Sequence, residues 1–312
     1  MENQKRVSEM IHNMEQIIVG KREAIEFALI TLLAGGHLLL EDVPGVGKTT
    51  LAKTMAQTLN CGFTRIQFTP DTLPSDVTGL SIYNMQTGKF EYSKGAIMNQ
   101  IVLADEINRT SPKTQASLLE AMEEKQVTVD GITYPLAQPF MVIATQNPID
   151  YLGTYNLPEA QLDRFMMKIS IGYPHAGDEK VMAERFLSHH LVKKLEPVVD
   201  AETVIQMQKE VEKVKVNQDL ITYITKIVQE TRRDNNISLG ASPRATLALL
   251  RASQAFAYIN GRDFCIPDDI IKLVQPVIAH RIILSPEARL SQAKTEKILK
   301  TIVTKIPVPI LS

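Results

Sequence analysis

Short apolar runs alternate with amphipathic segments through the first half of the chain. Each run is a few residues long, and the run at 101–104 is continuously apolar, which is typical of a strand buried on both faces of a parallel sheet. The expected strands are 37–40, 65–69, 101–104, 140–145 and 166–171. Helical periodicity is found at 7–18, 22–34, 48–60 and 112–124. This alternation predicts an α/β fold built on a parallel sheet.

Two segments between the expected strands are too long for simple connections. Residues 80–83 and 89–92 alternate apolar and polar positions around a short turn, and residues 127–134 do the same around Asp130-Gly131. An Asp-Gly pair between alternating residues is a strong signal for a two-residue hairpin. We therefore expect two hairpins inserted into the α/β fold.

The strand pattern stops after Pro174. Helical patterns follow at 219–230, 243–258, 267–278 and 292–303, with Asn217 and Ser242 as expected helix caps. We predict an α/β domain over residues 1–174 and an all-α domain over residues 175–312.

Composition restricts the classes of function. The 312 residues carry a formal net charge of −1 and two cysteines, Cys61 and Cys265. The balanced charge disfavours a general nucleic-acid binder, and two cysteines favour a reducing compartment over a disulfide framework. No apolar run reaches the roughly 18 residues of a membrane span, and the N-terminus does not read as a signal peptide. We expect a cytoplasmic protein.

The segment 38–51 carries the clearest chemical signal. An apolar strand runs into a small-residue loop that ends in Gly-Lys-Thr-Thr, and an amphipathic helix follows. Glycines allow successive backbone N–H groups to face phosphate oxygens, the lysine reaches the β- and γ-phosphates, and the first threonine binds Mg²⁺. The predicted nucleotide-binding residues are Pro44, Gly45, Val46, Gly47, Lys48, Thr49 and Thr50. Asp42 stands where the common pattern has its first glycine, and the alternative is an ordinary glycine-rich turn.

Polar side chains also follow two other expected strands. Asp105 and Glu106 come at the end of one, and Asn147 ends the next. In open α/β sheets these carboxyl ends form the ligand site. Asp105 would hold Mg²⁺ with Thr49, and Glu106 would activate water. The alternatives are a solvated acidic turn and an Asn-Pro turn before Pro148.

Two arginines are further candidates. Arg164 lies in Leu-Asp-Arg-Phe, where a surface ion pair with Glu159 or Asp163 is the alternative. Arg244 lies in the first turn of a helix, where a cation opposes the helix dipole unless an anion is close. His280 and Arg281 are interpreted as a helix C-terminal cation pair.

Together these residues resemble the AAA+ ATPases, and within them the MoxR subfamily. The similarity extends over nearly the whole chain. The stretches that carry it are LEDVPGVGKT (40–49), ADEINR (104–109), LLEAMEE (118–124), ATQNP (144–148), LPEAQLDRF (157–165) and GASPR (240–244).

The resemblance implies a helix-2-insert AAA+ fold. The strand order would be 5-1-4-3-2, with an α-helical lid after the sheet. The hairpin at 80–92 would be the helix-2 insert, and the one at 127–134 would precede the first sensor. Asn147 would be sensor 1, Arg164 the arginine finger and Arg244 sensor 2. Val19 and Gly20 would cup the adenine of ATP.

The expected activity is Mg²⁺-dependent ATP hydrolysis coupled to the remodelling of a partner protein. The resemblance implies a hexameric ring and a partner with a von Willebrand factor A domain. Three rivals remain: a DNA-directed motor or transcription regulator, a P-loop phosphotransferase, and a nucleotide-gated binding module. The hairpins offer Lys89 and Lys94 but also Glu91 and Asp130, which disfavours a DNA-tracking surface.

Overall fold

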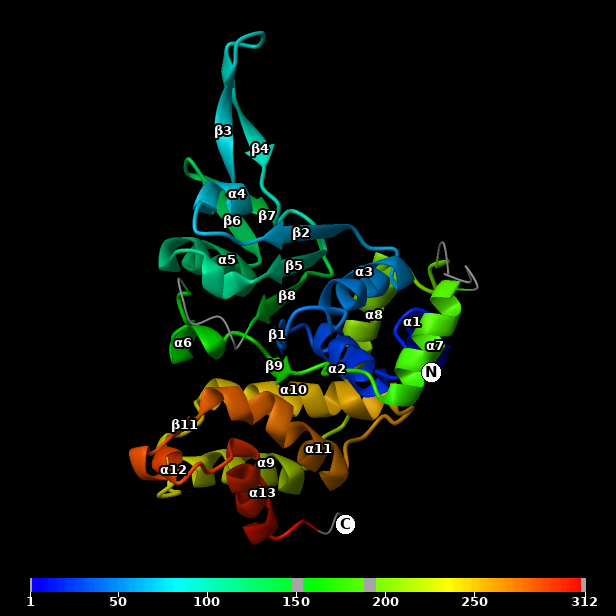
Figure 1. The fold of residues 1–312 in the computed structure, drawn as a ribbon, viewed down its shortest axis with the longest axis vertical. Helices are drawn as coiled ribbons and strands as arrows, with labels where there is room; N and C mark the ends of the chain where they lie inside the picture. The colour runs from blue at the N-terminus through cyan, green and yellow to red at the C-terminus, as the bar shows by residue number, and fades with distance from the viewer. Residues whose placement is uncertain (1, 148–153, 188–194, 310–312) are drawn as a thin grey trace.

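The computed structural model describes residues 2–147, 154–187 and 195–309, and at its centre lies a five-stranded parallel sheet (Figure 1). The sheet order is β2-β5-β8-β1-β9. Its strands are β1 (Leu38–Glu41), β2 (Phe63–Gln67), β5 (Ile101–Asp105), β8 (Met141–Gln146) and β9 (Met167–Ile169). Numbered within the sheet, this is the order 5-1-4-3-2, so the predicted fold class is confirmed.

Alternate residues of β1, β5 and β8 enter two separate cores. In β1, Leu38 and Leu40 face one cluster and Leu39 faces the other, as expected from the two-residue repeat of a strand. The first cluster is covered by α1 (Glu2–Glu15), α2 (Arg22–Leu33) and α3 (Lys48–Thr58). The second is covered by α5 (Pro112–Glu124). The nearly continuous apolar runs of the sequence follow from burial on both faces.

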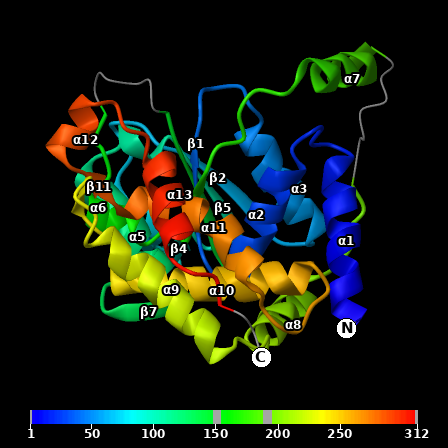
Figure 2. The same ribbon diagram turned by 90° about the horizontal axis from the view of Figure 1, so that it is seen from below.

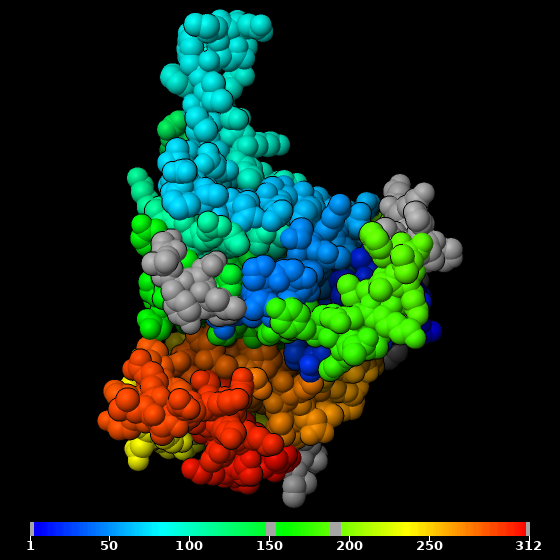
Figure 3. Space-filling model, in the orientation of Figure 1, coloured from blue at the N-terminus to red at the C-terminus, as the bar shows by residue number. Residues whose placement is uncertain are grey.

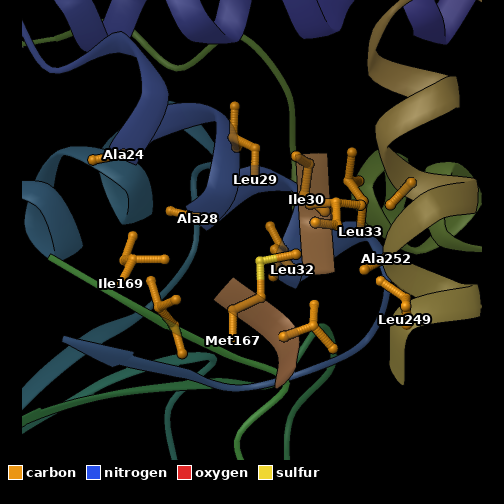
Figure 4. Packing of buried hydrophobic residues seen from close by; sticks show 14 of the residues in the cluster. Ala24, Ala28, Leu29, Ile30, Leu32, Leu33, Met167, Ile169, Leu249 and Ala252 are labelled. Carbon is orange, nitrogen blue, oxygen red and sulfur yellow. The ribbon is translucent and has the colours of Figure 1, made fainter. Parts of the chain in front are cut away.

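The C-terminal part packs beneath the sheet and shares its first core. In Figure 4, Leu249 and Ala252 lie against Leu33, and Leu29 and Ile30 are close by. The helices here are α8 (Ala201–Val211), α9 (Gln218–Thr231), α10 (Pro243–Ile259), α11 (Pro267–Ile278), η2 (Ala279–Arg281), α12 (Pro286–Leu290) and α13 (Thr295–Lys305). Because α10 and α2 bury apolar side chains against each other, the lid is held firmly on the sheet domain.

One feature differs from the expected all-α region. Strands β10 (Ile237–Leu239) and β11 (Ile283–Leu284) pair antiparallel, so the prediction that strands stop after Pro174 was wrong. Strand β10 is three residues long and β11 is two, which is too short to show an alternating pattern.

Helix α7 (Ala176–Leu187) lies apart from the other C-terminal helices in Figure 2 and contacts the α1–α2 loop, where Arg185 Nη1 donates to the Gln16 carbonyl (2.6 Å).

Both predicted hairpins are present and contact each other. They are β3 (Gly79–Asn84) with β4 (Lys89–Lys94), and β6 (Gln126–Val129) with β7 (Ile132–Pro135). Asp130 and Gly131 both have positive φ (50° and 78°), as the predicted two-residue turn requires. The Tyr92 and Tyr134 rings stack with their centroids 4.0 Å apart, so the second hairpin supports the base of the first. Figure 3 shows the first hairpin projecting from the body of the molecule.

Short elements complete the described chain. They are α4 (Pro74–Thr78), η1 (Ile107–Arg109) and α6 (Glu159–Leu162). No helix among the described residues is long and apolar enough to cross a membrane.

A buried imidazole joins β1, β8 and the end of α5. His37 Nε2 donates to the Met122 carbonyl (3.1 Å), and Nδ1 accepts from the Val142 N–H (3.0 Å). A protonated ring would place a second N–H against that donor. Burial, and to a smaller extent the nearby Lys125, lowers the pKa of His37 from 6.5 to about 4, although the hydrogen bond to Met122 opposes the shift.

The depressed pKa of His37 makes the protein less stable in acid. Above pH 6.5 the imidazole is neutral whether folded or unfolded. Below pH 6.5 His37 is protonated in the unfolded chain but stays neutral in the folded chain. The free energy of unfolding therefore falls as the pH drops towards 4. Between pH 7 and 4.5 this loss is about 2 kcal/mol. Urea unfolding of His37→Gln should show a correspondingly smaller pH dependence, whereas His12→Gln, on an exposed site, should behave like the wild type. Equal slopes for all three proteins would contradict the assignment.

Candidate functional site

The loop between β1 and α3 has the geometry of a phosphate cradle. Gly45 and Gly47 have φ of 86° and 93°, a region that favours glycine. Gly47 is the N-cap of α3 and makes no side-chain capping hydrogen bond, so the first-turn N–H groups face the loop without a capping side chain. Lys48 Nζ donates to the Asp42 carbonyl (2.7 Å), which keeps the ammonium group beside the loop. The residues therefore fit a bound triphosphate.

Asp42 has a structural role that the sequence pattern does not reveal. Its buried carboxylate accepts hydrogen bonds from the Ser170 hydroxyl (2.7 Å) and from the N–H groups of Ile171 (2.5 Å) and Gly172 (3.1 Å). A glycine at this position could make none of these bonds. Asp42 thus fastens the phosphate loop to the segment that follows β9.

An apolar pocket of about 220 Å³ adjoins the loop. Val19 lines it, together with the loop residues Gly45, Val46 and Gly47. Its size and apolar lining suit a flat heteroaromatic ring. Gly20 is not among the residues that line this pocket; a Cβ there would meet the Asp178 carboxylate of α7 at 2.0 Å, so glycine permits the close approach of that helix.

Asp105 and Glu106 lie at the carboxyl end of β5, as predicted. The Asp105 carboxylate accepts from Arg65 Nη2 (2.6 Å) and from the Thr145 hydroxyl (2.6 Å). Glu106 has a left-handed backbone (φ 58°), and its N–H donates to the Thr145 oxygen (2.8 Å). Thr145 therefore aligns both acids from the neighbouring strand β8.

The Glu106 carboxylate is itself restrained. It accepts from Gln67 Nε2 (2.8 Å) and forms an ion pair with Arg109 Nη1 (2.9 Å). Sequence reasoning missed Arg65, Gln67 and Thr145, because nothing in their local pattern shows which residues they meet on neighbouring strands. Asn147 directly follows β8 and is buried, at the same edge of the sheet.

Arg164 and Arg244 lie together, although 80 residues separate them in the chain, and share one carboxylate. Arg164 Nη2 is 3.2 Å from Glu123 Oε2, and Arg244 Nη2 donates to Glu123 Oε1. Glu123 is the anion that the sequence argument required near Arg244. The alternative for Arg164 was an ion pair with Glu159 or Asp163, and the ion pair that it forms is with Glu123 instead.

This arginine pair lies near the amino ends of the parallel strands, whereas the phosphate loop lies at their carboxyl ends. Arg164 precedes β9, where the Met166 N–H donates to the His37 carbonyl (2.8 Å) at the start of β1. The phosphate loop begins after the far end of that strand. From His37 to Asp42 the chain advances about 16 Å at about 3.3 Å per residue. Neither guanidinium therefore reaches a phosphate held by the loop of its own chain.

Arg281 clamps the segment that carries Arg164. Its buried guanidinium donates to Asp163 Oδ1 (2.7 Å) and to the carbonyls of Phe165 (2.6 Å), Met166 (3.0 Å) and Val277. Burial lowers the pKa of Arg281, and the Asp163 hydrogen bond opposes that shift. The expected helix-terminal cation pair accounts for the Val277 contact alone. It was wrong for His280, because burial and the neighbouring Arg281 hold the pKa of His280 well below 6.5.

Comparisons with known proteins agree with this geometry. Residues 37–167 match the ATPase family associated with various cellular activities (AAA), and residues 229–302 match the AAA lid domain. The chain is 36% identical to the chaperone MoxR1 of Mycobacterium tuberculosis over 96% of its length and 81% of the relative's. The chain belongs to the MoxR-type AAA ATPases.

Other relatives cover nearly the full length. The uncharacterized protein YeaC of Bacillus subtilis is 51% identical over 96% of this chain and 94% of its own. The crystal structure of a putative ATPase from Cytophaga hutchinsonii superposes with a TM-score of 0.93 at 40% identity, covering 99% of this chain and 96% of that one. The predicted family and the α/β core with its helical lid are thus confirmed.

Replacing Asp42 by the glycine of the common motif should destabilise this protein. Asp42→Gly removes a charged acceptor from three donors. Each hydrogen bond to a charged group is worth about 1.5–3 kcal/mol, and because the three share one carboxylate their contributions do not simply add, so we expect a loss of at least about 3 kcal/mol in urea unfolding. Glu41→Gln is the matched control, since its half-exposed ion pair with Lys168 contributes about 0–1 kcal/mol. If Asp42→Gly were as stable as the wild type, the three hydrogen bonds of Asp42 would not stabilise the fold as we infer.

Proposed function

We propose that this protein hydrolyses ATP in a ring, in which Arg164 and Arg244 of one subunit complete the phosphate site of the next. The observation that carries the proposal is the position of both arginines, at the edge of the sheet opposite the phosphate loop. A contact between these two faces is head-to-tail, and such contacts close into rings. The family suggests an oligomer, and we propose a hexamer by resemblance.

The roles within the site follow from the chemistry of phosphoryl transfer. Backbone N–H groups of residues 45–50 and the Lys48 ammonium bind the phosphates, with Pro44 shaping the loop, and Val19, in the pocket beside the loop, and the adjacent Gly20 border the base. Once the Glu106 carboxylate has released its contacts with Gln67 and Arg109, it accepts the proton of the attacking water. Asn147 orients that water. Arg164 and Arg244 of the neighbour stabilise the charge that develops on the γ-phosphate.

Thr49 and Asp105 would hold Mg²⁺, which neutralises charge on the phosphates when bound. A hydroxyl and a carboxylate are oxygen ligands that suit this ion. The Asp105 carboxylate is already paired with Arg65 and Thr145, which fits contact with the ion through a water molecule.

We further propose a chaperone role, acting with a von Willebrand factor A domain protein. MoxR1 bears the name chaperone, and the family resemblance implies the partner. The projecting β3–β4 hairpin exposes Ile82, Tyr83, Met85 and Phe90, of which Met85 is 91% exposed. Exposed apolar side chains suit contact with protein better than tracking of phosphates, so we favour this role over the DNA-directed one.

Glu106→Gln should bind ATP with unchanged affinity but lose turnover by at least about a hundredfold, because the general base is removed while the phosphate contacts remain. Fluorescent-nucleotide titration and phosphate release measure the two quantities. Glu124→Gln, an exposed acid on α5, serves as the control and should retain full activity. Normal turnover in Glu106→Gln would refute its role.

Mixing two inactive variants tests the shared site. Lys48→Ala cannot bind phosphate but keeps its arginines, and Arg164→Ala has the opposite defect. In equimolar mixed rings about a quarter of the head-to-tail interfaces combine an intact loop with an intact arginine, so about a quarter of the wild-type ATPase rate should return. The absence of any recovery, with mixed rings verified by mass, would contradict action in trans.

A further inference from the structure

Glu123 occupies a position between the two arginines that no motif accounts for. It lies next to the last residue of α5, and each of its carboxylate oxygens contacts a different guanidinium. Arg164 belongs to the segment before β9, and Arg244 belongs to the first turn of the lid helix α10. One side chain of the sheet domain thus joins two charged groups that reach it from different parts of the fold.

The end of α5 is fixed in place. The carbonyl of Met122 accepts from the buried His37 ring, and Lys125 ends the helix with a left-handed backbone (φ 54°) whose N–H donates to the Ala121 carbonyl (3.0 Å). The Glu123 backbone is therefore anchored to the start of β1. A side chain on such an anchored helix end can position its partners more closely than one on a free loop.

The charges around Glu123 explain why a carboxylate is needed. A pocket of about 260 Å³ is lined by four cations, Arg164, Arg244, Arg281 and Lys125, and by two acids, Glu123 and Asp163. Asp163 is already engaged by Arg281 Nε (2.7 Å) and by the Ser242 hydroxyl (2.7 Å). Without Glu123, the guanidinium groups of Arg164 and Arg244 would repel each other. The surplus of positive charge also leaves the pocket attractive to an incoming phosphate.

Each arginine keeps donors for that phosphate. Glu123 engages Nη2 of both side chains, and the side chains of Arg164 and Arg244 remain 29% and 53% exposed. A guanidinium has five N–H donors, so contact with Glu123 and contact with a phosphate are compatible.

We propose that Glu123 is a positioning residue that holds Arg164 and Arg244 together as a pair for the ATP bound to the neighbouring subunit. This rests on the proposed function, because it presumes that the arginines act in trans. Glu123 itself touches no substrate. Since its side chain is 37% exposed and such ion pairs add little stability, its contribution is to geometry and not to folding.

The test is Glu123→Gln, which keeps the shape of the side chain and removes its charge. We expect kcat about tenfold lower, equivalent to about 1.4 kcal/mol in the barrier, with KM for ATP, ring mass and Tm unchanged. Glu124→Gln, its exposed neighbour on the same helix, is the matched control and should match the wild type. Wild-type kcat in Glu123→Gln would overturn the proposal, and so would a loss of Tm or of ring assembly, which indicates a structural role.

Mixed rings separate this inference from the proposed function. Glu123→Gln subunits keep an intact phosphate loop, so adding Lys48→Ala subunits, with intact arginines, should raise the rate above that of Glu123→Gln alone. If Lys48→Ala rescues Arg164→Ala but not Glu123→Gln, Glu123 does not act through the arginine pair and the inference fails. If it rescues neither, the proposed action in trans fails, and the inference with it.

Discussion

Strand β1 separates the two halves of the proposed catalytic site. The phosphate loop follows its carboxyl end, and His37 at its amino end is bonded to the end of α5 and to the segment that carries Arg164. The strand is buried on both faces and paired in parallel with β8 and β9. The distance of about 16 Å between its flanking residues is therefore fixed, and a site that needs both ends requires a second copy of the chain.

The lid takes part in the same arrangement. Its helix α10 packs on α2 through apolar side chains, and Arg281 bonds the lid to residues 163–166. Arg244 consequently belongs to the same rigid face as Arg164. We interpret this face as the surface offered to a neighbour, with Glu123 setting the spacing of its two guanidinium groups. Asp42 plays a comparable part on the opposite face, where it ties the phosphate loop to the segment that follows β9.

Much of the fold could be predicted from local pattern. Buried parallel strands appear as apolar runs, Asp130-Gly131 marks a hairpin, and Gly45 to Thr49 mark a phosphate loop, because each depends on neighbours within a few residues. The pairing of Arg164 with Arg244, the clamp made by Arg281 and the bonds of Asp42 depend on residues 80 or more positions away. Such contacts leave no periodic trace in one sequence, and strands as short as β10 and β11 leave none either.

The central claim is that both arginines serve the ATP of a neighbouring subunit. A cryo-EM structure of the Glu106→Gln ring with ATP and Mg²⁺ tests this most directly. The account predicts the guanidinium groups of Arg164 and Arg244 within hydrogen-bonding distance, about 3 Å, of the γ-phosphate bound to the adjacent chain, with Glu123 between them. Either arginine contacting the γ-phosphate of its own chain would contradict it.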